Sequence, residues 1–476
     1  MVDSLHQIWS EVLKVPIFSN CDDFYAIGGN SLLAIQLYYK IKKSLNTDIS
    51  FNYLLVRPLT IEGLAHAIVF PHVGKDAVDS HQQVKYDIEA FRKMNINFQK
   101  AGRANVVFLT GATGFIGSHI LSELLCIQSI SSIYCLVRAN NSFDGFDRVV
   151  NALNQFNLKS NHLGKIKIVI GNLSEEKFGL GHNDWVNMSK VVDTIVSCGA
   201  LVNFELSYLS LRNVNTLSTQ TLMELASLGT KKSFHFVSSL AVFGIDHSVI
   251  CDLKKFDESL NNKLVPASGY AQSKFASEKM IGFAIDKGLS ANIYRLGEVM
   301  PSSVFGIPNP RSLYHLFIKD IIRLGFFPRV RNYYDYLPID FVAKFVVRLI
   351  IGKIDHNKNI FNICHPIGLA FGILTDLLCD RFLLVGPIES KKLFCLMNDN
   401  PSVNTGIGAV INFYFNKNFV RYSNGEFDMF ELFFLKEMNQ IIQSNTSSKL
   451  LELGMVYPTL DQHTIIPYVD YLVADT

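Results

Sequence analysis

The spacing of apolar residues changes at about residue 104. Before that point they recur at helical intervals, as in Ile8, Trp9, Val12 and Leu13, so residues 1–70 are predicted to form a small all-α bundle. After it come short apolar runs of strand length, separated by segments of helix length. These runs are 106–109, 133–137, 166–170, 194–197 and 233–237. Buried strands that alternate with helices predict an α/β domain with a parallel sheet.

A polar segment separates the two patterns. Residues 71–103 begin with Pro71 and Gly74 and continue through a polar run, which is typical of a connection between domains. We therefore expect a linker over 71–103, in which residues 84–99 form one charged helix.

The α/β pattern ends near residue 300. Residues 104–300 are predicted to form the core domain, and residues 301–476 a smaller, mainly helical part, because the alternation of strands and helices becomes irregular there. Within that part, 335–370 is expected to return to the core. The periodicity of 385–476 is weak, and it indicates no role beyond a lid or cap.

Charge and composition narrow the functional classes. Lys and Arg number 44 against 42 Asp and Glu, and without a concentrated basic face no nucleic-acid partner is expected. The first residues lack the pattern of a signal peptide, and no run approaches the roughly 18 apolar residues of a membrane span. The 8 cysteines form neither a C-x-x-C pair nor a recurrent metal-ligand spacing. Free thiols, no metal and a cytoplasmic location are therefore expected.

A glycine-rich turn follows the first predicted strand. Gly111, Gly114 and Gly117 form a G-x-x-G-x-x-G spacing that opens a helix. The first glycine permits the tight turn, the second lets the backbone approach a pyrophosphate, and the third lets the helix pack on the strand. The predicted dinucleotide contacts are Thr110, Gly111, Thr113, Gly114, Phe115, Ile116 and Gly117. The alternative is a strand–helix turn without a ligand.

An arginine stands at the end of the second predicted strand. An NAD site usually has Asp or Glu there to accept hydrogen bonds from the ribose hydroxyls, whereas this chain has Arg138. An arginine can pair with a 2′-phosphate, so NADPH is predicted over NADH, with Arg148 as a second contact. The alternative is that Arg138 is only a solvated strand end.

A Tyr-x-x-x-Lys pair begins a later helical segment. Tyr270 and Lys274 lie one turn apart on one helical face. A free phenol has a pKa of about 10, and a neighbouring ammonium is expected to lower the pKa of Tyr270. The pair then provides a general acid for a carbonyl oxygen that receives hydride. Ser239, at the end of an earlier predicted strand, is expected to hold the same oxygen, with Ser238 as the alternative.

Together these elements resemble the extended short-chain dehydrogenase/reductase family. The segments that carry the resemblance lie within residues 104–345 in the family's order: TGATGFIG, CLVRA, 199–203, Asn215, VSSLAVFG, GYAQSKFASE, Arg295 and 338–340. Within the family, the chain is similar to the thioester reductase domains that terminate nonribosomal peptide and polyketide synthases. It is also similar to aminoadipate and carboxylic acid reductases.

The resemblance implies a Rossmann-type core and a reaction. The expected reaction is NADPH-dependent reductive release of a carrier-bound acyl or peptidyl thioester as an aldehyde, or as an alcohol after a second round. The resemblance adds Asn172, Leu173 and Ala200 to the cofactor contacts, and it implies that Lys274 holds the cofactor ribose beside Tyr270.

The chain departs from the family pattern in three places. Asn172 stands where Asp is usual, which is expected to loosen an adenine contact, and Pro301 stands where Gly is common on the substrate side. Residues 216–218 replace the usual Val-x-Gly after Asn215. Relatives that cyclise their substrate without redox chemistry lack the tyrosine, so Tyr270 favours a reductase.

The N-terminal bundle resembles an acyl or peptidyl carrier domain. The segment DDFYAIGGNSL over residues 22–32 follows the carrier pattern, and the resemblance implies that Ser31 bears a 4′-phosphopantetheine arm. A phosphodiester at the start of a helix meets free N–H groups. The alternative is that Ser31 is only a helix N-cap. The expected partners are a phosphopantetheinyl transferase and an upstream adenylation or synthase module, because these residues contain no adenylation domain.

Two other functions fit parts of the pattern. A sugar-nucleotide epimerase or dehydrogenase of the same fold shares the glycine loop and the Tyr-x-x-x-Lys pair but has no use for a carrier. A redox-inactive docking module is the second alternative. The sequence leaves the acyl group undetermined.

Overall fold

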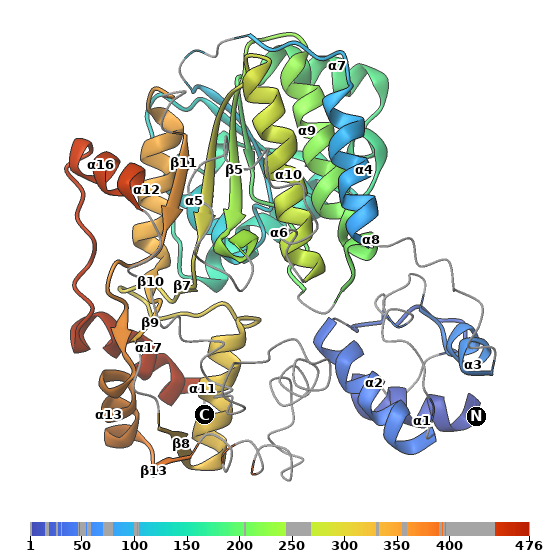
Figure 1. Ribbon diagram of the computed structural model, residues 1–476, viewed down its shortest axis with the longest axis vertical. Coiled ribbons are helices and arrows are strands. Elements are labelled where there is room, and N and C mark those ends of the chain that lie inside the picture. Colours follow the sequence, from blue (N-terminus) through green and yellow to red (C-terminus); the bar gives the residue numbers. More distant parts are fainter. Residues whose placement is uncertain are drawn as a thin grey trace.

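The computed structural model describes most of the chain. The described residues are 2–14, 19–24, 27–29, 31–45, 47, 54, 59–69, 80–99, 102, 104–203, 206–243, 268–329, 333–354, 359–389, 393, 396 and 443–475. Figure 1 shows the N-terminal helices, a large domain with a central sheet, and a smaller C-terminal part. In the portion covered by these ranges, no helix is long and apolar enough to cross a membrane.

The N-terminal bundle consists of short amphipathic helices. They are α1 (Val2–Leu13), α2 (Ser31–Leu45) and α3 (Ile61–Val69). Their apolar faces meet around Trp9, which is fully buried and packs edge-on against Phe24 with 5.0 Å between the ring centroids. Leu37 and Leu64 complete the same core. The predicted all-α bundle is confirmed.

A seven-stranded parallel sheet forms the centre of the large domain. Its strands are β1 (Val106–Thr110), β2 (Ser132–Val137), β3 (Ile166–Ile170), β4 (Thr194–Ser197), β5 (Ser233–Ser239), β6 (Ser290–Leu296) and β11 (Ile360–Ile363). They lie in the order β11-β6-β5-β4-β1-β2-β3. This is the doubly wound, Rossmann-type arrangement, so the predicted fold class is confirmed.

Helices cover both faces of the sheet (Figure 1). One face is packed by α5 (Phe115–Leu125), α6 (Ser142–Gln155) and α12 (Ile339–Ile351). The other is packed by α4 (Ser80–Arg92), α7 (His182–Val191), α9 (Ser218–Ser227) and α10 (Gly269–Asp286). Both faces are therefore apolar, which explains why the strands read as continuous apolar runs.

Residues 80–92 of the expected linker form a helix that packs on the core domain. Helix α4 runs from Ser80 to Arg92, so the helix expected over 84–99 begins earlier and ends earlier than predicted. Val84, Ile88 and Phe91 on one of its faces are buried against the core domain. The spacing i, i+4, i+7 places these side chains on a single stripe, which explains the docking. The charged residues Arg92 and Lys93 at its end are exposed, whereas the charged Asp87 is buried.

The C-terminal part contributes to two cores. Helices α11 (Leu313–Leu324), α13 (Phe371–Arg381) and α17 (Gln462–Asp475) surround a tyrosine-rich core. Short strands accompany them: β7 (Val299–Met300), β8 (Phe326–Pro328), β9 (Tyr333–Tyr334), β10 (Leu337–Pro338), β12 (Leu369–Ala370) and β13 (Val385–Ile388). Helix α16 (Ser444–Glu452) instead covers the edge strand β11, where Thr446 donates a hydrogen bond to the carbonyl of Asn362 over 2.8 Å. This part of 385–476 thus protects a sheet edge, a role that the sequence did not indicate.

Candidate active site

The site lies where the strand order reverses. Strand β1 pairs with β2 on one side and with β4 on the other, and folds of this type bind their ligands beyond the carboxyl ends of these strands. Thr110 ends β1 and is fully buried. Its hydroxyl oxygen accepts hydrogen bonds from the N–H groups of Cys198 at 3.2 Å and Gly199 at 3.0 Å. Thr110 therefore joins the two strand ends rather than facing solvent.

Steric limits fix two glycines of the loop. Gly111 has a φ of +78°, and a Cβ on it would lie 2.7 Å from the nitrogen of Gly199. A Cβ on Gly117 would lie 2.0 Å from the carbonyl oxygen of Gly111. The backbone of the loop therefore packs closely against the start of α5. The N-cap residue of this helix, Gly114, has no capping side chain. Thr113 and Gly114 are exposed there, so the helix N-terminus can receive an anion, as a dinucleotide pyrophosphate requires.

The two predicted arginines lie together beyond β2. Arg138 follows the strand directly, and Arg148 on α6 donates a hydrogen bond from its guanidinium to the carbonyl oxygen of Arg138. Both residues are exposed. Two exposed arginines at one strand end, joined by this contact to the Arg138 backbone, suit a dianionic phosphate.

The remaining predicted cofactor residues follow β3 and β4. The side-chain amide of Asn172 donates to Glu175 over 3.2 Å, and its oxygen accepts from the N–H of Ser174. Asn172 thus makes the local bonds of a turn. Leu173 lies against Gly199, where an added Cβ would be 2.8 Å from a methyl carbon of Leu173. Ala200 is half-buried in the loop after β4.

Tyr270 and Lys274 lie on the first turns of α10. Ser268 caps this helix by accepting a hydrogen bond from the N–H of Ala271 over 3.2 Å. Both side chains of the pair are buried. The Nζ of Lys274 donates to the carbonyl oxygen of Val237 over 2.8 Å, which brings it to the end of β5 two residues before Ser239.

The neighbouring serines of β5 have different surroundings. Ser238 is buried and donates its hydroxyl proton to Glu278 over 2.6 Å, and Glu278 forms a buried ion pair with Arg295 at 2.7 Å. Ser239 is half-buried, and its hydroxyl oxygen accepts from the N–H of Ala241. Because Ser238 is bound to Glu278 in the protein interior, the arrangement favours Ser239 as the hydroxyl available to a substrate.

The electrostatics of the pair differ from the sequence prediction. Burial, followed by the nearby Cys198 thiol, raises the pKa of Tyr270 above its usual value. Burial lowers the pKa of Lys274 to about 8, although Cys198 and Glu278 oppose the change. The prediction that Lys274 lowers the pKa of Tyr270 is therefore wrong for this structure. The reason is that desolvation of the phenolate outweighs any attraction by the ammonium.

Two protein families match the two parts of the chain. Residues 109–346 match the NAD-binding family described as "Male sterility protein", and residues 3–68 match the family described as "Phosphopantetheine attachment site". The chain belongs to the male sterility protein family. Its Rossmann-type core is thus accompanied by a carrier-type N-terminal segment, as the resemblance implied.

This family member has relatives among much longer proteins. It is 32% identical over 375 residues to the L-2-aminoadipate reductase large subunit of Candida glabrata, covering 72% of this chain and 27% of that relative. It is 30% identical over 371 residues to a subunit of the linear gramicidin synthase of Brevibacillus parabrevis, covering 76% of this chain and 7% of that relative. The chain therefore spans about a quarter of the first relative and a small fraction of the second.

Two solved structures share the fold. The terminal R domain from the myxalamid PKS-NRPS biosynthetic pathway has a TM-score of 0.71 and 24% identity, covering 83% of this chain and 98% of that structure. A thiolation-reductase di-domain from an archaeal non-ribosomal peptide synthetase has a TM-score of 0.67 and 20% identity, covering 100% of this chain and 97% of that structure.

The site also contains a residue to which sequence reasoning assigned no role. Asn215 lies in the π-helix η4 (Arg212–Leu217) and is buried. Its amide donates to the carbonyl of Leu201 and to the hydroxyl of Ser273, both at 3.0 Å, and its oxygen accepts from the N–H of Leu201 at 2.8 Å. Asn215 thus ties the loop after β4 to the helix that carries Tyr270. The only sequence signal was its position in the family pattern.

Within the residue ranges that the structure describes, no group of three or more His, Cys, Asp or Glu side chains is arranged to hold a metal ion.

Proposed function

We propose that this protein is an NADPH-dependent reductase that releases an acyl or peptidyl group from its own carrier as an aldehyde. The observation that carries the proposal is the buried Tyr270–Lys274 pair at the end of β5, next to a dinucleotide-type loop, in a chain that also matches a carrier family. Relatives named as aminoadipate reductases and terminal R domains support the same chemistry.

The nicotinamide supplies the hydride that reduces the thioester carbon when the cofactor is bound. The residues of this chain orient the thioester and provide the proton. Ser239 donates a hydrogen bond to the thioester oxygen and holds it beside the phenol of Tyr270. Lys274 holds the cofactor ribose, fixed through its bond to the Val237 carbonyl.

The raised pKa of Tyr270 suits the role of a proton donor. A phenol that keeps its proton can transfer it to the oxygen as negative charge develops there. Hydride on carbon and a proton on oxygen give a thiohemiacetal. Its collapse breaks the carbon–sulfur bond, releases the aldehyde and returns the pantetheine thiol.

We propose NADPH rather than NADH because of the two arginines beyond β2. Arg138 and Arg148 lie in contact and exposed, where a 2′-phosphate would be expected on a Rossmann-type fold. The test is to compare NADPH with NADH as electron donor, and equal kcat/KM for both would contradict this part of the proposal.

We further propose that the carrier occupies residues 1–70, with 104–300 as the cofactor-binding core and 301–476 as the substrate part. Ser31 begins α2, the position at which a phosphodiester meets free N–H groups, although the side chain of Ser31 lies outside the described residues. A phosphopantetheinyl transferase and an upstream module are the partners this requires. The free thiols of the described cysteines support a reducing compartment such as the cytoplasm.

Substitution of Tyr270 tests the central proposal. Tyr270→Phe is expected to lower NADPH oxidation with an acyl-pantetheine thioester by at least about a hundredfold, because the proton donor is lost. Tyr134→Phe on β2 is the matched control and should keep full activity. Mass spectrometry should show unchanged phosphopantetheine loading in both variants.

The outcomes separate the alternatives. Undiminished turnover in Tyr270→Phe would overturn the mechanism. Wild-type activity with a UDP-sugar and none with the thioester would indicate an epimerase or dehydrogenase. Absence of turnover with either substrate would indicate a docking module.

A further inference from the structure

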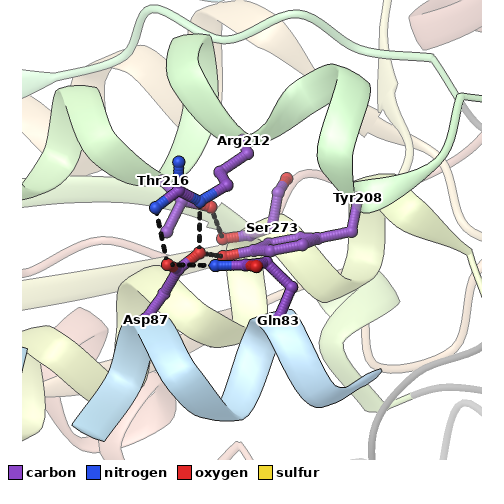
Figure 2. Close-up of polar contacts among 6 residues, drawn as sticks. All are labelled: Gln83, Asp87, Tyr208, Arg212, Thr216 and Ser273. Carbon is purple, nitrogen blue, oxygen red and sulfur yellow. Dashed lines mark hydrogen bonds and ion pairs between the residues drawn. The ribbon is translucent and has the colours of Figure 1, made fainter. Parts of the chain in front are cut away.

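A buried carboxylate joins helix α4 to the active-site side of the core domain. Asp87 on α4 is 3% exposed. Its oxygens accept hydrogen bonds from two nitrogens of Arg212, both at 2.7 Å, and from the phenol of Tyr208 at 2.6 Å. Gln83, one turn earlier on α4, adds a bond of 2.9 Å. Figure 2 shows these side chains converging on Asp87 from α4, α8 (Tyr208–Leu211) and η4.

The contact between Asp87 and Arg212 is more specific in geometry than an ordinary ion pair on a protein surface. The guanidinium of Arg212 meets the carboxylate with both Nε and Nη2, the two-bond arrangement that fixes orientation as well as distance. The side chain of Arg212 is 27% exposed, whereas that of Asp87 is 2% exposed. These donors compensate the burial of the carboxylate, so neutralising it removes one acceptor oxygen and leaves the charge of Arg212 without its buried partner.

Hydrogen bonds connect the surroundings of Asp87 to α10, the helix that carries Tyr270. Arg212 is the first residue of the π-helix η4, a conformation that is rare and frequent at functional sites. In the same π-helix, Asn215 bonds Ser273, and the hydroxyl of Ser273 donates to the carbonyl oxygen of Tyr270 over 2.7 Å. Thr216 reaches the carbonyl oxygen of Ser273 at 3.4 Å, and Figure 2 shows both beside the cluster.

Helix α4 is held independently at its other end. Lys287, just after α10, donates to the carbonyl oxygens of Arg92 at 3.1 Å and Met94 at 2.6 Å. The guanidinium of Arg92 lies over the ring of Phe283, 5.1 Å from its centroid. Because this second attachment does not involve Asp87, removing one charge need not release the helix.

We infer that Asp87 is a positioning residue, and that helix α4, between carrier and core in the sequence, sets the active site through the π-helix. It fixes Arg212, and the π-helix then holds Asn215 against Leu201 and Ser273. The loop after β4 and the first turn of α10 consequently keep the geometry in which Tyr270 meets the substrate. The effect on catalysis rests on the proposed reductase function.

The experiment compares two charge-neutralising substitutions on one helix in the full-length protein. Asp87→Asn removes the buried charge, and Glu89→Gln removes the exposed charge that pairs with Arg92 at 3.5 Å. Tyr208→Phe, which removes the phenol donor to Asp87 and keeps the carboxylate, is a milder variant should Asp87→Asn fold poorly. The measurements are kcat and KM with NADPH and an acyl-pantetheine thioester, the NADPH dissociation constant, and amide hydrogen exchange.

A positioning role predicts a selective pattern. Asp87→Asn should lower kcat by about ten- to a hundredfold, as expected for small misplacement of a catalytic group, while the NADPH dissociation constant stays within about twofold. Exchange of peptides covering 199–217 should become faster, and Tyr208→Phe should show a smaller change of the same kind. Glu89→Gln should behave like the wild type.

Other outcomes overturn the inference. Unchanged exchange over 199–217 in Asp87→Asn would show that the cluster does not hold the π-helix. Equal losses of kcat and NADPH affinity, or equally faster exchange throughout the core domain, would show a general structural role. If the wild type reduces no thioester, the proposed function fails, but the exchange comparison still decides whether Asp87 holds the π-helix.

Discussion

At the scale of single residues, burial governs the chemistry of the Tyr-x-x-x-Lys pair. Desolvation keeps the proton on Tyr270 and brings the pKa of Lys274 down to about 8, within reach of physiological pH. The residues of the pair could be predicted from the sequence because their spacing is local. The direction predicted for the pKa of Tyr270 was wrong because burial depends on chain segments far away in sequence.

The lowered pKa of Lys274 predicts a pH limit. Below about pH 8 Lys274 carries its positive charge, and this charge is lost as the pH rises through that value. We therefore expect kcat/KM to fall by about tenfold per pH unit at higher pH. Lys274→Arg keeps its charge over this range and should extend the plateau to higher pH, even at lower absolute activity. The measurement is the pH profile of both proteins. An identical alkaline limb in the two profiles would contradict the assignment.

At the scale of elements, the close approach of backbone segments explains why glycines stand in the loop between β1 and α5. The sequence indicated the strand, the turn and the helix correctly, since their signals lie within a dozen residues. It also assigned the close packing to the third glycine, but it could not show which atoms approach it. The structure shows that Gly117 has backbone atoms in the way of a Cβ, whereas Gly114 has only one contact at 3.4 Å.

Substitution of Gly117 should separate fold from cofactor binding. Gly117→Ala would place a Cβ 2.0 Å from the Gly111 carbonyl oxygen, so the loop and the start of α5 must move apart. We expect a loss of about 1–3 kcal/mol in the free energy of unfolding and a rise of about tenfold or more in the NADPH dissociation constant. Gly164→Ala, where nothing lies within 4 Å of the added Cβ, is the control. Equal behaviour of the two variants in urea unfolding and NADPH titration would refute the steric argument.

At the scale of the whole molecule, the chain joins a carrier-type bundle to a Rossmann-type core through a helix that belongs structurally to the core. Helix α4 was expected within a linker because Pro71, Gly74 and a polar run are typical of a connection between domains. Its stripe of Val84, Ile88 and Phe91 is buried against α10 and the sheet. Under the proposed function, a carrier joined to the core domain in one chain raises the local concentration of its cargo.

The tether predicts a difference between attached and free substrate. Ser31→Ala should abolish reduction of an acyl group loaded by a phosphopantetheinyl transferase, because the attachment hydroxyl is gone. Reduction of free acyl-pantetheine should be unchanged, since the core domain is intact. Ser44→Ala, on the exposed end of the same helix, is the control. Loading of the Ser31→Ala protein, detected by mass spectrometry, would contradict the assigned attachment site.

The sequence by itself determined the order of elements, the glycine turn, the Tyr-x-x-x-Lys pair and the carrier segment. Each depends on residues close together in the chain. Only the tertiary structure decided that Ser238 forms a hydrogen bond with Glu278, 40 residues away, and that Asp87 pairs with Arg212, 125 residues away. Such contacts depend on which faces meet after folding, and periodicity along one segment carries no information about its partner.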